Sequence, residues 1–326
     1  MLVVIIGGSG HVGTYLVPKL VGAGYKVINV TRGQRQPYIP HEAWKDVQTV
    51  FIDRIAEEAA GTFGKKIHDL GGDIVIDMIC FTRESCQHLV ESLCGRVFQF
   101  IHCGTIWVHG YGMQVPITEN MPRHPFGEYG TRKAEIESYL MDEYQRNGFP
   151  ATMLHPGHMV GCGWKPINPA ANLNPVVFKK LITGDILNLP NFGLETLHHV
   201  HCDDVAQAFM LAIENYNDAV GQSFNVVSPA AVTLRGYAET VAGWFGQEAK
   251  IEFMPFEEWS STVSEDDARI THAHILHSSN FSIDKAQNML GYRPRYNSYR
   301  AIYESVEWML QNNLIFPEEK SLPLMR

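Results

Sequence analysis

The sequence predicts an α/β protein built on a doubly wound parallel sheet. Three observations support this fold class. Short β-branched runs alternate with amphipathic helical stretches through the first half of the chain, the apolar runs are continuous, and the first run ends in a cluster of glycines. Continuous apolar strands indicate a sheet buried on both faces, and the intervening helices supply the cover.

The expected elements of the first half follow in chain order. Apolar and helical periodicity predict strands at 2–7, 26–31, 47–53, 73–79, 97–104 and 151–156, with helices at 11–24, 54–70, 83–94 and 129–147. Gly148 and Pro150 mark the end of the last helix.

The second half changes character at about residue 157. A loop rich in Gly, Pro and Asn comes first, which is typical of an ordered segment near a ligand. It is followed by expected strands at 195–201 and 222–227 and by expected helices at 203–216, 233–246, 282–292 and 299–313. We therefore expect two units. The first is formed by 1–160 plus the strands near 195–227, and a smaller α/β lobe is formed by 161–194 and 228–326.

The composition excludes several classes of protein. The 326 residues carry a formal net charge of −9, which argues against an electrostatic nucleic-acid binder. The six cysteines lack metal-ligand spacing, so reduced thiols in a cytoplasmic protein are expected. No apolar run approaches the ~20 residues of a membrane span. We expect neither a membrane nor a nucleic-acid partner.

The glycine cluster GGSGHVG predicts a dinucleotide site. Gly7, Gly10 and Gly13 follow a strand and open a helix, with His11 and Val12 between the last two. Gly7 allows the tight turn, Gly10 lets a pyrophosphate approach the backbone, and Gly13 lets the helix pack on the strand. The helix N-terminus then receives the anion, so the first unit is expected to be a Rossmann domain.

The end of the second strand suggests which dinucleotide binds. NAD sites usually carry an acid there, whereas this chain has Thr31 and Arg32, with Arg35 close behind. Arg32 is placed to pair with a 2′-phosphate, so the expected cofactor is NAD(P), with NADP favoured over NAD. Asp53, after the third strand, is expected either to meet the adenine or to cap the next helix.

The stretch EYGTRK places Tyr129 and Lys133 four residues apart, on one face of a helix. Alone, this pair is an ordinary surface feature. With GxxGxxG at the start and YxxxK beyond the middle strands, however, most of the chain resembles the extended short-chain dehydrogenases/reductases, the group of NDP-sugar epimerases and dehydratases. The segments HCGTIWVHG, LHPGHMVG, HVHCDDVAQA and KAQNMLGYRP also resemble motifs of that group, in the same order.

The resemblance implies a catalytic set of Thr105, Tyr129 and Lys133. Tyr129 would exchange a hydroxyl proton during hydride transfer, Thr105 would donate to the substrate oxygen, and Lys133 would hold the nicotinamide ribose and favour the phenolate. The resemblance also places further residues near the cofactor, namely Ile79, Cys80, Phe81, Pro156, Gly157 and His158. A packing role for each of these stays open.

Substrate contacts are expected from Thr105, Tyr129, Trp107, His109, His158 and Asn172, with Trp107 and Trp164 as stacking faces for a sugar. The chain departs from the group where that group holds a diphosphate, because Leu197 or His198 stands at the place of an expected Arg. Ile106 and Trp107 after Thr105 also disfavour dehydratase chemistry. The histidines around 198–201 and 272–277 are interpreted as pocket residues, and no metal is expected.

Two functions remain open. The first is an NAD(P)-dependent oxidoreductase or epimerase acting on a secondary hydroxyl of a sugar-like substrate, expected as a homodimer formed through the helices near 83–94 and 127–146. The second is a non-catalytic relative that senses dinucleotide or binds RNA. Retention of Thr105, Tyr129 and Lys133 favours the enzyme.

Overall fold

A computed structural model describes residues 1–317 and contains the expected parallel sheet. Seven strands lie in the order β11-β6-β5-β4-β1-β2-β3, and all neighbouring pairs are parallel. The strands are β1 (Leu2–Ile6), β2 (Lys26–Thr31), β3 (Val47–Phe51), β4 (Ile74–Asp77), β5 (Gln99–Cys103), β6 (Ala151–Pro156) and β11 (Gln222–Val226). The chain order reverses at β1, which has β2 on one side and β4 on the other, and ligands of such sheets bind beyond the carboxyl ends at this point.

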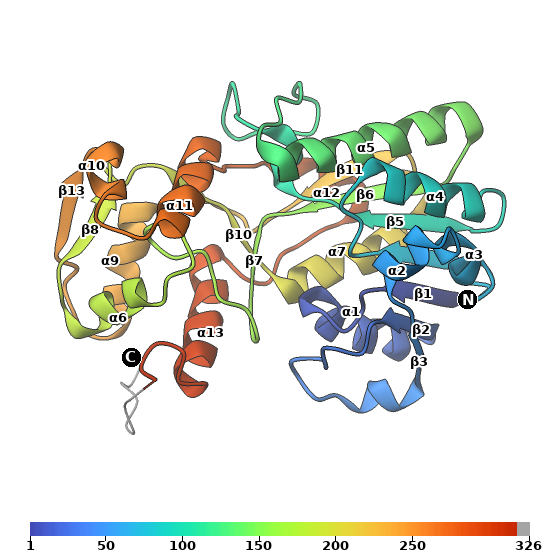
Figure 1. Ribbon diagram of the computed structural model, residues 1–326, viewed down its shortest axis with the longest axis horizontal. Coiled ribbons are helices and arrows are strands. Elements are labelled where there is room, and N and C mark those ends of the chain that lie inside the picture. The colour runs from blue at the N-terminus through green and yellow to red at the C-terminus, as the bar shows by residue number, and fades with distance from the viewer. Residues whose placement is uncertain (318–326) are drawn as a thin grey trace.

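Helices cover both faces of the sheet (Figure 1). Side chains alternate along β1, so that Val3 and Ile5 join one core while Val4 and Ile6 join the other. The first core is completed by α1 (His11–Gly22), α7 (Cys202–Glu214) and α12 (Asp284–Leu290). The second core is completed by α3 (Phe63–His68), α4 (Arg83–Leu93) and α5 (Gly127–Asn147). The connections add η1 (Glu42–Asp46), α2 (Arg54–Ala59), η2 (Ile106–His109) and α8 (Tyr216–Ala219).

A smaller lobe with its own apolar core lies beside the sheet (Figure 1). Its strands form three two-stranded pairs, β7 (His158–Val160) with β10 (His199–His201), β9 (Thr196–Leu197) with β12 (Val232–Thr233), and β8 (Leu187–Pro190) with β13 (Ile251–Met254). Its helices are α6 (Val176–Thr183), α9 (Leu234–Trp244), α10 (Phe256–Ser260), α11 (Glu265–His277) and α13 (Ser298–Gln311). Among residues 1–317, no helix is both long and apolar enough to cross a membrane.

Three expected elements differ from the structure. The helix expected at 54–70 is two helices, because the chain turns at Gly61, whose φ of 67° lies in the left-handed region. The strand expected at 195–201 is β9 and β10, and neither joins the seven-stranded sheet. Helix α12 packs its Ala286 and Leu290 into the core of that sheet, whereas 228–326 was expected to build the lobe. An apolar strand or helix shows that it is buried, but its pattern does not show which core receives it.

Candidate active site

A cavity of about 450 Å³ lies beyond the carboxyl ends of β1, β2, β3 and β4. Seven of the residues expected near the cofactor line it, namely Gly7, Gly10, Thr31, Arg32, Asp53, Ile79 and Phe81. Gly7 has a φ of 88°, and a Cβ there would lie 2.9 Å from Ile79 Cγ2, so a side chain at this position would crowd the cavity. A Cβ on Gly13 would lie 1.8 Å from the Gly8 carbonyl oxygen, which explains the third glycine by backbone packing.

The residues of this cavity fit a dinucleotide. Helix α1 begins there with Gly10 as its N-cap and without a side-chain cap, so first-turn N–H groups remain for an anion. The exposed guanidinium groups of Arg32 and Arg35 also line the cavity. Asp53 lines it and also caps α2, since its Oδ1 accepts hydrogen bonds from the backbone N–H groups of Ile55 and Ala56. Both alternatives for Asp53 therefore remain compatible with the structure.

Sequence reasoning missed Arg54, which forms the floor of this cavity. Its Nη1 donates to both carboxylate oxygens of Asp77 at 2.8 and 2.9 Å, and its Nε donates to Glu58 Oε1 at 2.7 Å. The ion pair joins the first residue of α2, three residues beyond β3, to the last residue of β4, so it holds two cavity-forming segments together. The sequence did contain a signal for Arg54, because this arginine directly follows the apolar strand expected at 47–53.

The remaining expected cofactor residues do not line the cavity. His11 is buried between the ring of Tyr38, which stacks on it at 4.3 Å, and Trp164, which meets it edge-on at 3.7 Å. The others are packed into cores, strands or the lobe connection, namely Val12, Gly13, Cys80, Pro156 and His158. The side chains of Val12 and Cys80 belong to the two cores of the sheet, so they stabilise the elements around the cavity and do not line it.

Thr105, Tyr129 and Lys133 lie together beyond the end of β5. Thr105 caps η2, with its Oγ1 accepting from the Trp107 N–H at 3.3 Å. Tyr129 stands in the first turn of α5, and Lys133 follows one turn later on the buried face. The Lys133 Nζ donates to the Cys103 carbonyl at 2.9 Å and lies 5.1 Å from the ring centre of Phe81, a cavity residue. This ammonium therefore connects the expected catalytic residues to the cofactor cavity.

The electrostatics of the Tyr129 phenol differ from the sequence-based expectation. Although Tyr129 is 43% exposed, the protein around its phenol raises the pKa to about 12; the Cys103 thiol acts in the same direction and Thr105 acts against them. Burial also lowers the pKa of Lys133, against the nearby groups of Cys103, Cys80 and Asp77. Lys133 is not among the groups that shift the Tyr129 pKa. In this arrangement the phenol is protonated at neutral pH.

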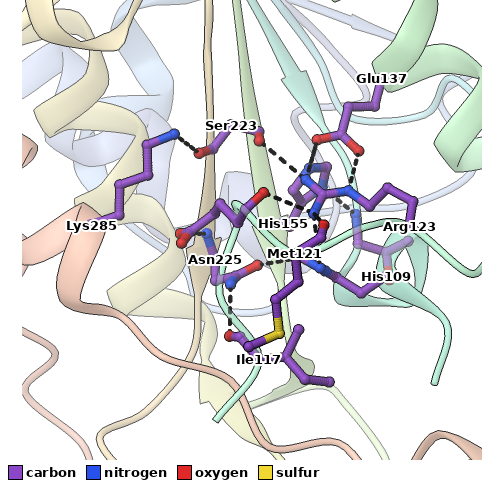
Figure 2. Close-up of polar contacts among 11 residues, drawn as sticks. His109, Ile117, Met121, Arg123, Glu137, His155, Ser223, Asn225 and Lys285 are labelled. Atoms are coloured by element: carbon purple, nitrogen blue, oxygen red, sulfur yellow. Dashed lines mark hydrogen bonds and ion pairs between the residues drawn. The ribbon is translucent and has the colours of Figure 1, made fainter. Parts of the chain in front are cut away.

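Behind Thr105 lies what we call the charged network, formed by His109, Glu119, Arg123, Glu137, His155 and Asn225 (Figure 2). Glu137 lies one turn beyond Lys133 on α5 and receives hydrogen bonds from Arg123 at 2.8 and 3.1 Å. Burial would raise the Glu137 pKa, but the contacts with His155 and Arg123 hold it well below its usual range. Glu137 is therefore a buried carboxylate with paired oxygens.

His155 connects the charged network to Thr105. Its Nδ1 accepts the Thr105 backbone N–H at 3.2 Å, so its proton is on Nε2, which donates to Glu137 Oε1 at 3.0 Å. The sequence showed His155 only as a departure from the family motif. The signal for its partner was the position of Glu137, four residues after Lys133 on the same helix face.

The charged network also corrects the expectation for His109. Both of its ring nitrogens have internal partners, Asn225 Oδ1 at 2.9 Å and Arg123 Nη1 at 3.0 Å, and its ring is buried. Asn172 is likewise buried, and its side chain bonds Asn168 and Thr271 within the lobe. Neither side chain is free to bind a substrate, so we withdraw both from the expected substrate contacts.

On the other side of η2 lies what we call the histidine cluster, formed by Trp107, Phe126, His158, His199, His274 and His277. The His277 ring stacks between Trp107 at 4.1 Å and Phe126 at 4.0 Å. The register of β7 and β10 pairs His158 with His199, which brings together two histidines far apart in sequence. Within residues 1–317, no group of three or more potential ligands is arranged to hold a metal ion.

Comparison with known proteins agrees with this geometry. The model of the NAD dependent epimerase/dehydratase family matches residues 82–226. Over 93% of its length, the chain is 26% identical to the chloroplast stem-loop binding protein of 41 kDa b of Arabidopsis thaliana, of which 78% is covered. It is 22% identical to a UDP-glucose 4-epimerase of Streptococcus mutans serotype c, with 94% of this chain and 95% of that protein covered.

A solved structure shows the same fold. The dTDP-glucose 4,6-dehydratase of Bacillus anthracis str. Ames, in complex with NAD, superposes with a TM-score of 0.73 at 17% identity, covering 97% of this chain and 99% of that one. Over residues 82–226 the chain is thus similar to the NAD dependent epimerase/dehydratase family, and its fold is that of the solved dehydratase.

Proposed function

We propose that the protein is an NAD(P)-dependent oxidoreductase or epimerase that acts on a secondary hydroxyl of a sugar-like substrate. The observation that carries the proposal is that Thr105 caps η2 and Tyr129 stands in the first turn of α5, which packs on η2, next to a buried Lys133 that reaches the cofactor cavity through Phe81. A hydroxyl donor and a phenol at one point are the groups that an alcohol or ketone oxygen needs during hydride transfer.

The residues of the site have separate roles in cofactor binding and proton transfer. A nicotinamide cofactor in the cavity supplies the carbon that accepts or returns a hydride. Gly7, Gly10 and the N-terminus of α1 would hold its pyrophosphate, and Lys133 would hold its ribose. Tyr129, with its pKa raised to about 12, gives a proton to a substrate ketone and takes it back from the alcohol. Thr105 donates a hydrogen bond to the same oxygen.

Replacement of Tyr129 by Phe tests this assignment. The variant keeps the aromatic ring and loses the proton, so turnover should fall by at least ~100-fold, the usual contribution of a general acid or base. Net oxidation or reduction is measured by the absorbance of the reduced cofactor with a panel of sugars, epimerisation is measured by NMR of the same sugars, and cofactor titration should be unchanged. Wild-type turnover by the variant, or no conversion of any secondary alcohol by the wild type, contradicts the proposal.

We further propose that NADP is preferred to NAD. Thr31 ends β2 without a following acid, and the exposed Arg32 and Arg35 line the cavity, where they suit a 2′-phosphate. Titration of the purified protein with both reduced cofactors checks this, with Arg32→Gln expected to weaken only NADPH. Tighter binding of NADH by the wild type would make the preference wrong. A cytoplasmic homodimer through α4 and α5 also remains our proposal, and sedimentation would test the pairing.

RNA binding is a second candidate, because one relative is named a stem-loop binding protein. The net charge of −9 works against it, since phosphate backbones attract basic surfaces. A gel-shift titration with a stem-loop RNA at two salt concentrations distinguishes the two functions. Salt-dependent RNA binding together with no sugar turnover would favour this candidate over the enzyme.

A further inference from the structure

The histidine cluster presents hydrogen-bond acceptors. His274 Nδ1 and His277 Nδ1 each lie 2.7 Å from a backbone carbonyl oxygen one turn earlier on α11, those of Ile270 and Ala273. A carbonyl oxygen only accepts, so both protons are on Nδ1 and each Nε2 carries a lone pair. His199 Nε2 lies 3.2 Å from the Ile167 carbonyl, so its lone pair is on Nδ1. The backbone therefore fixes three imidazoles in tautomers that offer an acceptor to their surroundings.

These rings are uncharged. Burial lowers the pKa of His199 to about 3 and that of His274 to about 4, and it lowers the pKa of His277 in the same direction. Apart from burial and backbone hydrogen bonds, only neighbouring histidines influence the pKa values of these three rings, and no Lys or Arg of the described residues does so. The cluster is thus a neutral group of largely buried rings, unlike the cofactor cavity with its arginines.

Several of the acceptors lack a partner among residues 1–317. His199 Nδ1 and His277 Nε2 are unpaired, although the two side chains are 0% and 4% exposed, and both ring nitrogens of His158 are unpaired as well. Buried polar atoms in native proteins nearly always have partners, so unpaired ones grouped together point to a bound molecule.

The cluster begins at the expected catalytic residues. The Trp107 ring meets the Tyr129 ring edge-on at 6.0 Å and the His274 ring edge-on at 5.1 Å. It stacks on the His277 ring at 4.1 Å. His158 continues the row, 5.1 Å from His274 and 5.7 Å from His199. A substrate whose hydroxyl meets Tyr129 would therefore place its remainder against these rings.

We propose that the histidine cluster binds the substrate, and that the part it binds is an uncharged group rich in hydroxyls, free of phosphate. This proposal rests on the proposed function and specifies its substrate class. Hydroxyls donate to imidazole lone pairs, whereas phosphate oxygens need donors or cations, which these tautomers do not offer. His198, at the place of the expected diphosphate clamp, is also occupied, with Nε2 on the Ser228 carbonyl at 2.8 Å and Nδ1 accepting from the Phe281 N–H at 3.0 Å.

Binding measurements on the full chain saturated with NADP⁺ test the proposal. Saturation-transfer NMR would compare a panel of free monosaccharides and methyl pyranosides with UDP-galactose and UDP. We expect at least one uncharged sugar to bind and UDP not to displace it. Binding of UDP-galactose ten or more times tighter than every free sugar overturns the proposal, and so does the absence of binding by any uncharged sugar. Because binding is read without turnover, sugar binding without conversion would count against the proposed chemistry alone.

Variants of α11 locate the site. His277→Phe and His274→Phe keep an aromatic ring and remove the acceptor, and each should weaken sugar binding about tenfold, the effect of one lost hydrogen bond. His272→Phe is the matched control, because His272 lies on the same helix with an exposed side chain. Cofactor titration and thermal melting check that each variant is folded. Unchanged sugar affinity in both folded variants overturns the assignment.

Discussion

The charged network and the histidine cluster bury polar groups on either side of η2 in opposite ways. In the charged network, the Glu137 carboxylate meets Arg123 and His155, and both ring nitrogens of His109 and of His155 have partners (Figure 2). In the histidine cluster the rings are neutral, and acceptors of His158, His199 and His277 lack partners among the described residues. A fully paired network fixes backbone positions, whereas unpaired acceptors keep hydrogen-bonding capacity for a ligand.

The largest effect that separates the two regions is expected from Glu137→Ala. This change leaves the buried His155 and the half-buried Arg123 guanidinium without their carboxylate, and breaking such a pair costs about 3 kcal/mol of folding free energy. Urea unfolding measures the loss. Glu128→Ala is the control, since Glu128 pairs with Arg132 on the exposed surface of the same helix, and it should change stability by less than about 0.5 kcal/mol. Equal effects of the two changes would show that the network is not a stabilising unit.

A smaller effect is expected from His155→Phe, which removes the acceptor of the Thr105 N–H and the donor to Glu137. Unsatisfied buried groups of this kind cost about 2 kcal/mol. Because Thr105 is then no longer held, turnover should fall while the KM for the cofactor stays constant. His155→Gln retains an amide acceptor and donor, and should recover part of the turnover. Loss of stability without any change in turnover would assign His155 to folding only.

The same contrast explains how far the sequence predicts the site. Gly7, Thr31, Asp53 and Ile79 were found because each lies at the end of a strand or within two residues of it, and parallel strand ends meet at one edge of the sheet. Whether the side chains of His109 and Asn172 are available to a substrate depends instead on their partners Asn225 and Thr271, which lie 116 and 99 residues further along the chain. A polar side chain alone does not reveal whether its partner is a substrate or a distant residue.

For the strands around 195–201, the sequence predicted the conformation but not the strands with which they pair. Alternation predicted an extended segment there, and the segment is extended, but its pairing with β7 and β12 depends on the lobe. That pairing places His199 beside His158 and so creates the histidine cluster. Sequence reasoning identified the histidines as pocket candidates, whereas the tautomers of His274 and His277 follow only from the carbonyls that the structure places beside them.

The smallest effect we expect is a pH dependence of stability that the histidine cluster carries. His274 has a folded pKa of about 4, below the ordinary value of 6.5, because burial disfavours the charged ring. Between those values the unfolded chain binds the proton and the folded chain does not. Its contribution is therefore complete above pH 6.5 and is lost as the pH falls towards 4, at about 1.4 kcal/mol for each pH unit.

Urea unfolding between pH 7 and 5.5 measures this slope for the wild type, His274→Phe and the exposed control His272→Phe. The range from pH 7 to 5.5 lies above the pKa of Glu137, which its partners hold low. This carboxylate of the charged network therefore does not contribute to the pH dependence measured there. His109 adds to the wild-type slope through its own lowered pKa, so the informative quantity is the difference between variants. His274→Phe should reduce the slope by about one proton, and the control should leave it unchanged. An unchanged slope in His274→Phe would mean that this ring takes up a proton as readily in the folded chain as in the unfolded one, and a protonated His274 offers no acceptor to a substrate hydroxyl.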